Sequence, residues 1–202
     1  MYTLKLSKNE EDRAREIHKK SIVIDTLSGD PPRSRFSDKM IQKVEEWLEA
    51  KMPPEKRREE LEKLTLSEII DNPQVQKELY IGDWKKAGVT AVSETLGSND
   101  LVSSFRSFAP WMYKFDKLKH VIVKATAVKD IENAKKEDKH AIIFNFQNTV
   151  NIGYNVDLID LFYWMGIRIW QLTYNLRNNV GTGCTERNDS GISDFGVRVI
   201  ER

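Results

Sequence analysis

Short apolar blocks recur along this chain, and the segments between them carry apolar residues at helical spacing. The clearest block is Ala-Ile-Ile-Phe-Asn-Phe at residues 141–146, which is closed by polar residues and fits a buried strand. Alternation of such blocks with helical segments predicts an α/β fold with a parallel sheet. We expect right-handed crossovers and strands in sequential order, with the first two strands side by side. The predicted strands are residues 22–25, 89–95, 121–124, 142–146 and 167–173.

The intervening segments predict helices. Gly88 and Gly166 follow two of them and are suitable C-caps, and Ser193 is a suitable N-cap for a final helix. The other expected helices cover residues 9–19, 75–87, 99–118, 130–139 and 156–165.

Residues 31–72 depart from this rhythm and form a charged insertion with two Pro-Pro pairs. Within it, residues 37–51 and 54–64 carry apolar positions at helical spacing, which predicts two helices. In a barrel, an insertion after the first strand lies over the top face, as a lid or a dimer contact.

Polar side chains follow the last two predicted strands. Gln147 and Asn148 come directly after residues 142–146, and Tyr174 and Asn175 come after residues 167–173. Because catalytic and binding groups of βα barrels collect at the carboxyl ends of the strands, these four residues are candidates to line a substrate pocket. The alternative is that they cap their own loops.

One run of residues resembles a known family. It comprises Leu-Ile-Asp-Leu-Phe-Tyr-Trp-Met-Gly-Ile-Arg at 158–168, Gln-Leu-Thr-Tyr-Asn at 171–175, Gly183-Cys184 and Gly191-Ile192-Ser193. It is similar to the middle of the membrane (renal) dipeptidase family, a group of zinc-dependent (β/α)8 hydrolases that cleave dipeptides. The resemblance extends over about residues 10–202 and implies a partial TIM-type (β/α)8 barrel, a dipeptide or related amide as substrate, and zinc as the family's cofactor.

The family's zinc-binding positions hold other residues here. Its Asp-Gly-His-x-Asp pattern corresponds to residues 25–29, where Leu27 and Gly29 replace the two ligands. Gln147 stands in the place of the metal-bridging Glu, and Tyr174 in the place of a substrate-side His. We therefore expect this chain alone to bind no zinc, and interpret Phe-Gln-Asn-Thr and Leu-Thr-Tyr-Asn as the signature of a divergent branch.

Within this resemblance, Asp25 and Tyr174 are the candidate catalytic residues, and Gln147, Asn148 and Asn175 the candidate substrate-binding residues. A carboxylate such as Asp25 is costly to bury unless it is paired or binds metal, so hydrogen bonding to nearby backbone is its alternative role. Asp30 and Glu94 are further site candidates; a turn before the Pro pair is the alternative for Asp30.

The sequence is shorter than a complete barrel usually requires. A (β/α)8 barrel typically needs about 250 residues, whereas this sequence has 202 residues and five predicted strands. The resemblance places the family's remaining zinc-binding histidines on later strands. We therefore expect residues 1–202 to be the N-terminal portion of a single barrel, truncated or split. Its open sheet edge predicts a partner, either another copy or a second chain that completes the barrel.

The charge composition argues against some classes of binding partner. Lys and Arg number 32 against 31 Asp and Glu, so a net charge of +1 argues against nucleic acid or an acidic membrane as the main partner. A single Cys excludes an intramolecular disulfide. The first residues form no apolar signal region and no apolar run has the length of a membrane span, so we expect a cytoplasmic protein without a membrane anchor.

Three functions remain open. The first is a metal-dependent hydrolase of dipeptides or related amides, active when the barrel is complete. The second is a catalytically silent barrel that binds a small amide-bearing ligand. The third is a half-barrel that serves as an assembly partner.

Overall fold

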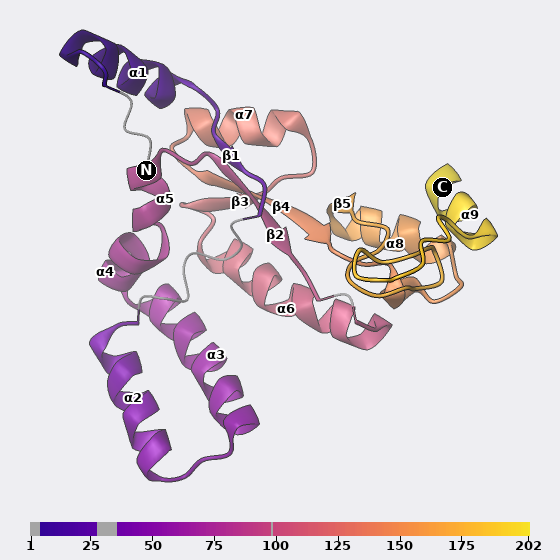
Figure 1. Cartoon of the computed structure of the whole chain (residues 1–202). Helices are drawn as coiled ribbons and strands as arrows, with labels where there is room; N and C mark the ends of the chain where they lie inside the picture. The colour runs from indigo at the N-terminus through magenta and orange to yellow at the C-terminus, as the bar shows by residue number, and fades with distance from the viewer. Residues whose placement is uncertain (1–4, 28–35, 98) are drawn as a thin grey trace.

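The computed structural model describes residues 5–27, 36–97 and 99–202, and the described strands form one parallel sheet with helices on both faces (Figure 1). This confirms the predicted α/β class and is consistent with part of a TIM-type barrel. Ile24 pairs with Ala91, so the first two strands are neighbours as expected. The strands are β1 (Ile24–Asp25), β2 (Ala91–Thr95), β3 (Ile122–Lys124), β4 (His140–Phe146) and β5 (Ile167–Trp170).

The strand order differs from the sequential order that we expected. It runs β1-β2-β4-β3, and β5 also pairs with β4. One edge of β4 pairs with β2; the other pairs with β3 near His140 and with β5 from Phe144 onward. The prediction of sequential order was wrong because β4, the most apolar block and one buried almost throughout, takes the central position.

Successive side chains of each strand point to opposite faces of the sheet, so each face has its own group of core residues. Phe144 and Phe146 pack against α6 (Leu101–Lys117) and α8 (Asp157–Met165). Their ring centres lie 5.6 Å from Phe108 and 4.9 Å from Phe162, respectively. The opposite face carries small residues, Ala91 and Ala141 among them, packed with α7 (Val128–Lys136). We call the row Val92, Ile142, Phe144 and Phe146 the apolar row, since it faces α6 and α8.

The N-terminal helix α1 (Lys8–Lys20) has no buried residue. Its His18 Nε2 lies 2.8 Å from the carbonyl oxygen of Ala87. Ala87 ends α5 (Gly82–Ala87), and Gly88 caps that helix in the left-handed region with φ of 67°, as the sequence predicts.

The helix expected over residues 75–87 is interrupted. The structure has α4 (Pro73–Val75), the π-helical turn η1 (Gln76–Tyr80) and then α5. The Ile81 N–H donates to the carbonyl of Gln76, five residues back, with an N–O distance of 3.0 Å. A Cβ at Gly82 would lie 2.9 Å from the Lys77 carbonyl oxygen, so glycine permits this irregular path.

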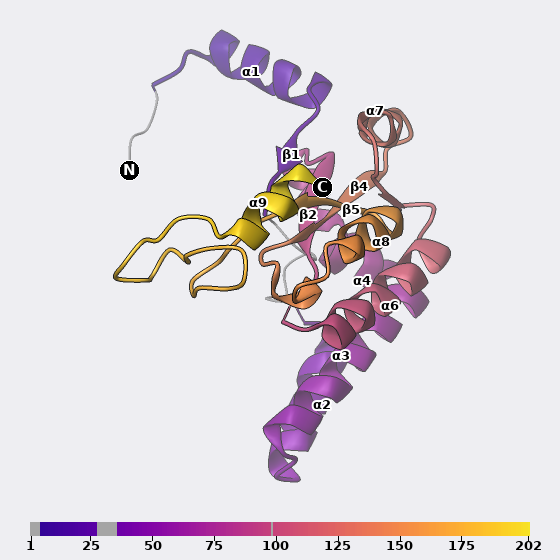
Figure 2. The same ribbon diagram turned by 90° about the vertical axis from the view of Figure 1, so that its right-hand side faces the viewer.

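The insertion contains two helices, α2 (Asp38–Glu49) and α3 (Pro54–Asp71). They form a hairpin that extends away from the sheet in both ribbon views (Figures 1 and 2), and α3 contacts α6. Lys39 pairs with the buried Glu68 at 2.5 Å and ties the two helices together. The location of this insertion over a barrel's top face stays a prediction.

The chain continues from β4 through the short 3-10 turn η2 (Val150–Ile152), and from β5 through a long loop to α9 (Asp194–Glu201). Ser193 Oγ accepts the Gly196 N–H at 3.0 Å, which confirms the expected cap. Arg202 pairs with Asp160 of α8. In the described part of the chain, no helix is both long and apolar enough to cross a membrane.

Candidate substrate site at the carboxyl edge of the sheet

A hydrogen-bonded group of polar side chains lies on β2 and β4, near the carboxyl ends of these strands. The Asn145 carboxamide donates to Ser93 Oγ at 2.7 Å and accepts from Thr95 Oγ1 at 2.9 Å. We call Ser93, Thr95 and Asn145 the polar row. These residues alternate with the apolar row along each strand, so they lie on the sheet face away from α6. None of the three was a candidate from the sequence; the alternating polar residues of β2 and the single Asn within the apolar run of β4 were the available signal.

Gln147 comes two residues after Asn145, directly beyond the end of β4, and is half-buried. Gln147 lies in a bend beyond the strand, so strand alternation does not fix the direction of its side chain, and its place beside the polar row stays a prediction. Its carboxamide would add a donor and an acceptor to a group that is electrically neutral.

Asn148 has a structural role in the loop. Its side-chain oxygen accepts from Asn178 Nδ2 at 2.7 Å and from the Thr149 N–H at 2.8 Å. Its carbonyl accepts from Trp170 Nε1 at 2.8 Å. These contacts agree with the alternative interpretation, loop capping, for this residue.

Asn178, which the sequence analysis overlooked, is the centre of that loop. Its Nδ2 also donates to Thr149 Oγ1 at 3.0 Å and to the Leu172 carbonyl at 2.8 Å. Its Oδ1 accepts from the Val180 N–H at 2.8 Å, which is an Asx turn. The Asn-Asn-Val-Gly sequence at residues 178–181 was the available signal for this turn.

Tyr174 and Asn175 are exposed on the loop that follows β5. Their carbonyls accept from the backbone of Cys184 at 2.8 Å and Thr185 at 3.0 Å. A Cβ at Gly183 would lie 2.4 Å from the Asn175 carbonyl oxygen, so only glycine allows this close approach. The backbone of both residues is thus fixed, while the Tyr174 side chain remains 44% exposed.

Asp25 is exposed at the end of β1, where its Oδ1 accepts the Leu27 N–H at 3.1 Å. Its register partner is Val92, which belongs to the apolar row. The strand register therefore does not bring Asp25 onto the face of the polar row. The local hydrogen bond agrees with the alternative role for Asp25. Gly29 and Asp30 lie outside the described residues.

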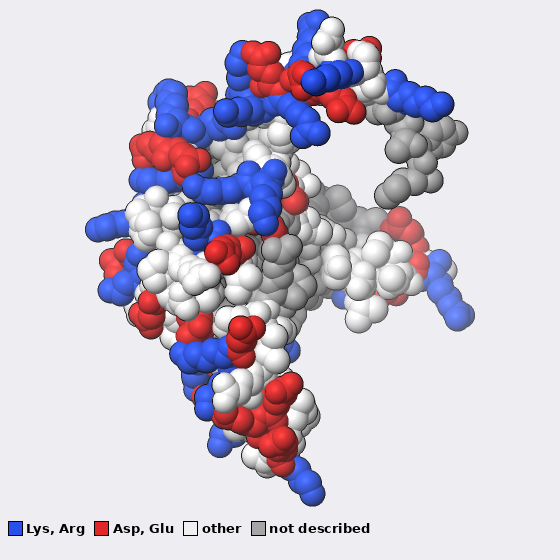
Figure 3. Space-filling view, turned by 90° about the vertical axis from the view of Figure 1, so that its left-hand side faces the viewer, with Lys and Arg blue, Asp and Glu red and all other residues white. Residues whose placement is uncertain are grey.

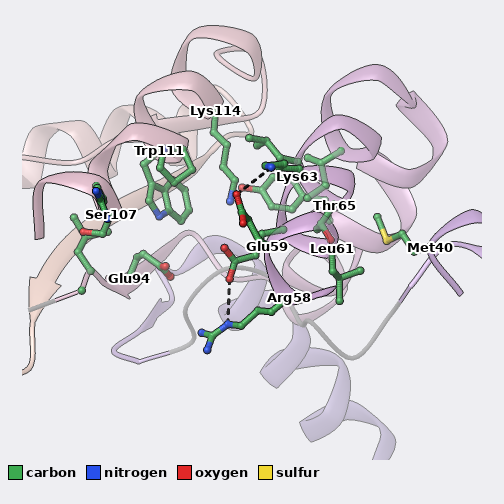
Figure 4. Close-up of a pocket in the computed structure, with 18 of the residues that line it drawn as sticks. Met40, Arg58, Glu59, Leu61, Lys63, Thr65, Glu94, Ser107, Trp111 and Lys114 are labelled. Atoms are coloured by element: carbon green, nitrogen blue, oxygen red, sulfur yellow. Dashed lines mark hydrogen bonds and ion pairs between the residues drawn. The ribbon is translucent and has the colours of Figure 1, made fainter. Parts of the chain in front are cut away.

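The Glu94 side chain lies on the sheet face opposite to that of the polar row. It pairs in register with Phe144 and lines a cavity of about 840 Å³ between α3, α6 and the end of β2 (Figure 4). The candidate role of Glu94 at the mouth of a barrel is therefore not supported by its direction.

The donors at the carboxyl edge do not fit a zinc site. Zinc in proteins is bound by thiolate, imidazole and carboxylate groups, whereas the polar row and Gln147 offer only neutral hydroxyls and carboxamides. Across residues 5–27, 36–97 and 99–202, no three His, Cys, Asp or Glu side chains are grouped to hold a metal. Leu27, at one position of the family's ligands, is 61% exposed. That this chain alone binds no zinc stays a prediction.

Charge is also mixed over the surface. On the face in Figure 3, basic and acidic side chains are interspersed, and the net charge of the sequence is +1. A single-sign surface of the kind that attracts nucleic acid does not appear on this face.

A parallel sheet with helices packed on it is an α/β fold and is consistent with part of a βα barrel. The chain matches the sequence profile of the membrane dipeptidase family (Peptidase family M19) over residues 11–202. It belongs to this family.

Solved structures with the same fold are also similar, while a search of curated proteins found no match. An amidohydrolase from Pseudomonas aeruginosa is 20% identical with a TM-score of 0.60, over 93% of this chain and 44% of that one. The probable dipeptidase PvdM from Pseudomonas aeruginosa is 14% identical with a TM-score of 0.67, over 98% and 48%. A metallopeptidase from Rhodobacter sphaeroides, liganded with a phosphinate mimic of the dipeptide L-Ala-D-Ala, is 10% identical with a TM-score of 0.53, over 67% and 52%. The chain therefore spans about half the length of these structures.

Proposed function

We propose that this chain forms part of the substrate pocket of a dipeptidase-type barrel that hydrolyses dipeptides or related amides. Membership of the membrane dipeptidase family supports this reaction class. Because the chain spans about half of the similar solved structures, the activity is proposed for a complete barrel, of which residues 1–202 supply the N-terminal portion.

The observation that carries the proposal is the neutral polar row together with Gln147. A peptide group has one N–H donor and one carbonyl acceptor, and a carboxamide side chain can satisfy both. The hydrogen bonds of Asn145 to Ser93 and Thr95 fix the orientation of Asn145. Sites supported by strands hold their geometry better than sites on loops, and Gln147 follows directly after β4, two residues beyond Asn145.

The roles of the other candidates follow from their positions. In this proposal Gln147 and Asn175 contact the amide of the substrate, while Asn148 shapes the loop beside them. Tyr174 has an exposed phenol, which is suited to donate a hydrogen bond to an oxyanion. Asp25 is the candidate carboxylate at the end of β1. A zinc ion serving the complete barrel would need ligands from beyond the described residues.

A second candidate is a catalytically silent barrel that binds a small amide-bearing ligand. The specific observation in its favour is that the family's ligand positions hold Leu27 and Gln147, and that the polar row carries no charge.

The proposal also includes a partner and a location. Trp164 is 80% exposed and Leu176 is 69% exposed, and these two side chains are candidates to contact a partner. We propose either self-association or a second chain that completes the barrel. The single Cys agrees with a reducing compartment, and we propose the cytoplasm.

Binding of dipeptides to the 202-residue chain tests the site. We expect an unhydrolysed dipeptide to shift the Gln147 side-chain amide resonances in NMR spectra. Gln147→Ala should weaken binding about tenfold, roughly 1.4 kcal/mol. Gln42→Ala, on the exposed surface of α2, is the matched control and should leave binding unchanged. An unchanged affinity for the dipeptide in Gln147→Ala would contradict the proposed pocket.

A measurement of dipeptide hydrolysis distinguishes the enzyme from the catalytically silent barrel. Adding zinc and the remaining strands of the barrel as a second chain should produce dipeptide hydrolysis if the enzyme proposal holds. Binding without turnover in that reconstituted sample would favour the silent barrel. Analytical ultracentrifugation of the 202-residue chain measures its mass in solution, and a mass above that of one chain would support self-association.

A further inference from the structure

The cavity between α3 and α6 is a candidate second binding site. Its volume of about 840 Å³ lies within the range of roughly 300–1,000 Å³ that is typical of small-molecule sites. Among the described residues, its lining comes mainly from α3, η1, the end of β2 and α6. Figure 4 shows Glu94, Ser107 and Trp111 at one side and Leu61, Thr65 and Met40 at the other.

The walls of the cavity are apolar and buried. Ile69 of α3, Tyr80 of η1, Leu96 after β2 and Trp111 of α6 are each at most 6% exposed. Four separate segments supply these side chains, so the cavity is shaped by the tertiary fold. A ligand body that fits these walls is stabilised by leaving water, and it must therefore be largely apolar.

The π-helical turn η1 contributes to the same wall. Its last two residues, Leu79 and Tyr80, both line the cavity. π-helical turns are rare in proteins and are frequently found at functional sites. The irregular backbone is a feature independent of the cavity's size, and it also points to binding at this place.

The charges at the rim of the cavity are largely balanced. Arg58 pairs with Glu62 at 3.4 Å, and Lys63 pairs with Glu59 at 3.1 Å, both within α3 (Figure 4). These four side chains and that of Arg106 are exposed. Water therefore screens them, and they contribute little to the selection of a ligand by charge.

Two further charged side chains line the inner part of the cavity and have opposite signs. Lys114 is 5% exposed, with its Nζ 4.3 Å from the centre of the Trp111 ring. Glu94 is partly buried at the end of β2. Together these two side chains have no net charge, so an ion of either sign would leave water without a net opposite charge to meet it. An uncharged ligand does not carry this cost.

One backbone acceptor on the wall has lost its usual helical donor. Pro110 lies inside α6 and has no N–H group. In a regular helix this N–H donates to the carbonyl four residues earlier, which here belongs to Arg106. Arg106 and Pro110 both line the cavity, and the carbonyl lies on the helix face that these two positions share.

We propose that this cavity binds a small uncharged molecule with an aromatic body and one hydrogen-bond donor, which donates to the carbonyl of Arg106. The apolar walls take the body. The balanced charge of the lining disfavours ions, and the carbonyl favours a hydroxyl or N–H group over a methyl ether of the same shape.

Displacement of an uncharged dye from the full chain tests the proposal. N-phenyl-1-naphthylamine becomes fluorescent in apolar surroundings, and the competitors at pH 7 share one body: 2-naphthol, 2-methoxynaphthalene, 2-naphthoate and 2-naphthylmethylamine. We expect 2-naphthol to bind about fivefold more tightly than the methyl ether. Each ion should bind at least about tenfold more weakly than 2-naphthol. An ion that binds as tightly as 2-naphthol, equal affinities for all four competitors, or no dye binding would overturn the proposal.

Replacing Pro110 assigns the preference for a donor. Pro110→Ala supplies the missing N–H to the carbonyl of Arg106, so 2-naphthol should lose its advantage over the methyl ether. Pro54→Ala, at the start of α3 and outside the described lining, is the matched control and should keep the advantage. An advantage that survives in Pro110→Ala would refute the role of this carbonyl.

Filling the cavity locates the dye. Thr65→Trp from α3 and Ser107→Phe from α6 occupy the space from opposite walls, and each should weaken dye binding at least about tenfold. Ser67→Trp, on the exposed side of α3, is the control and should bind the dye as the original chain does. Circular dichroism checks that each variant is folded, and unchanged dye binding in a folded, filled variant would refute the site.

This inference is independent of the proposed dipeptide pocket. Gln147→Ala should leave 2-naphthol binding unchanged, and Pro110→Ala should leave dipeptide binding unchanged. Failure of one proposal is therefore distinguishable from failure of the other.

Discussion

The Nδ2 atom of Asn178 lies 2.7 Å from the Oδ1 atom of Asn148, across 30 residues of sequence. This bond joins the end of β4 to the long loop after β5. It fixes the relative position of the two segments that supply Gln147 and Tyr174, so the candidate site depends on a residue that contacts no substrate in our proposal.

Replacing Asn178 with Ala should therefore loosen the loop. Three side-chain donor contacts of Asn178 are lost. The partly buried N–H groups of Val180 and Gly181 also lose Oδ1 as their acceptor, at about 1–3 kcal/mol of unfolding free energy. Urea unfolding measures this change. Asn188→Ala, in an exposed part of the same loop, is the control and should change stability by less than about 0.5 kcal/mol. Equal stability of the two variants would show that the Asn178 contacts are dispensable.

Protonation of His140 should make the stability of the chain depend on pH. Burial lowers the pKa of this imidazole below its usual 6.5, while a hydrogen bond to the Val89 carbonyl partly opposes the shift. The unfolded chain then binds the proton more tightly than the folded chain, so His140 favours folding when it is neutral. Its contribution is present above about pH 6.5 and is lost as the pH falls from there toward the lowered pKa of the folded state.

We expect thermal melts between pH 7.5 and 5 to show this loss in the original chain and a smaller loss in His140→Phe. His120→Gln changes an exposed imidazole and should retain the full dependence. A His140→Phe variant whose melting temperature falls with acidification as steeply as that of the original chain would contradict the role of His140.

Phe162 should be among the costliest core positions. It is completely buried, and its ring centre lies 4.9 Å from that of Phe146 and 5.7 Å from that of Trp170. Phe162→Ala leaves a cavity and should cost about 3–5 kcal/mol, against a typical total stability of about 5–15 kcal/mol. Denaturant unfolding of Phe162→Ala and of Trp164→Ala, which alters an 80% exposed side chain, provides the comparison. The second variant should stay within about 0.5 kcal/mol of the original chain.

Much of the secondary structure could be predicted from the sequence, because local patterns decide it. The block at residues 141–146 is apolar throughout, apart from Asn145, and became the central strand. Gly88 and Gly166 end helices with a left-handed backbone that glycine adopts readily, and Ser193 begins a helix with its side-chain hydroxyl as the cap, as the sequence indicates. The family resemblance was confirmed, since the dipeptidase profile covers residues 11–202.

The strand order was not predictable from these patterns, because pairing depends on contacts far apart in sequence. β3 has only three residues, too few to separate β2 from β4 along their length. The π-helical turn at Gln76–Tyr80 likewise results from backbone packing around Gly82, which helical periodicity does not reveal.

The sequence places Gln147 at the end of a strand, and the structure has it directly after β4. That this edge of the sheet lines a substrate pocket stays a prediction. The side-chain partners of Asn148 and Asp25 depend on loop geometry, which single residues do not encode. The polar row was overlooked because the hydrogen bond between Asn145 and Ser93 joins residues 52 apart, and no local pattern in the sequence reveals it.

The central position of β4 also has a consequence for synthesis on the ribosome. The pairing of Thr95 with Asn145 joins residues 50 apart, so β2 leaves the ribosome well before its partner exists. At a translation rate of about 5–20 residues per second, β2 waits roughly 3–10 seconds with one edge unpaired. During that interval α6 can cover only one face of the strand. A nascent chain paused between residues 100 and 139 should therefore be a target for chaperones, and release from them should coincide with emergence of β4.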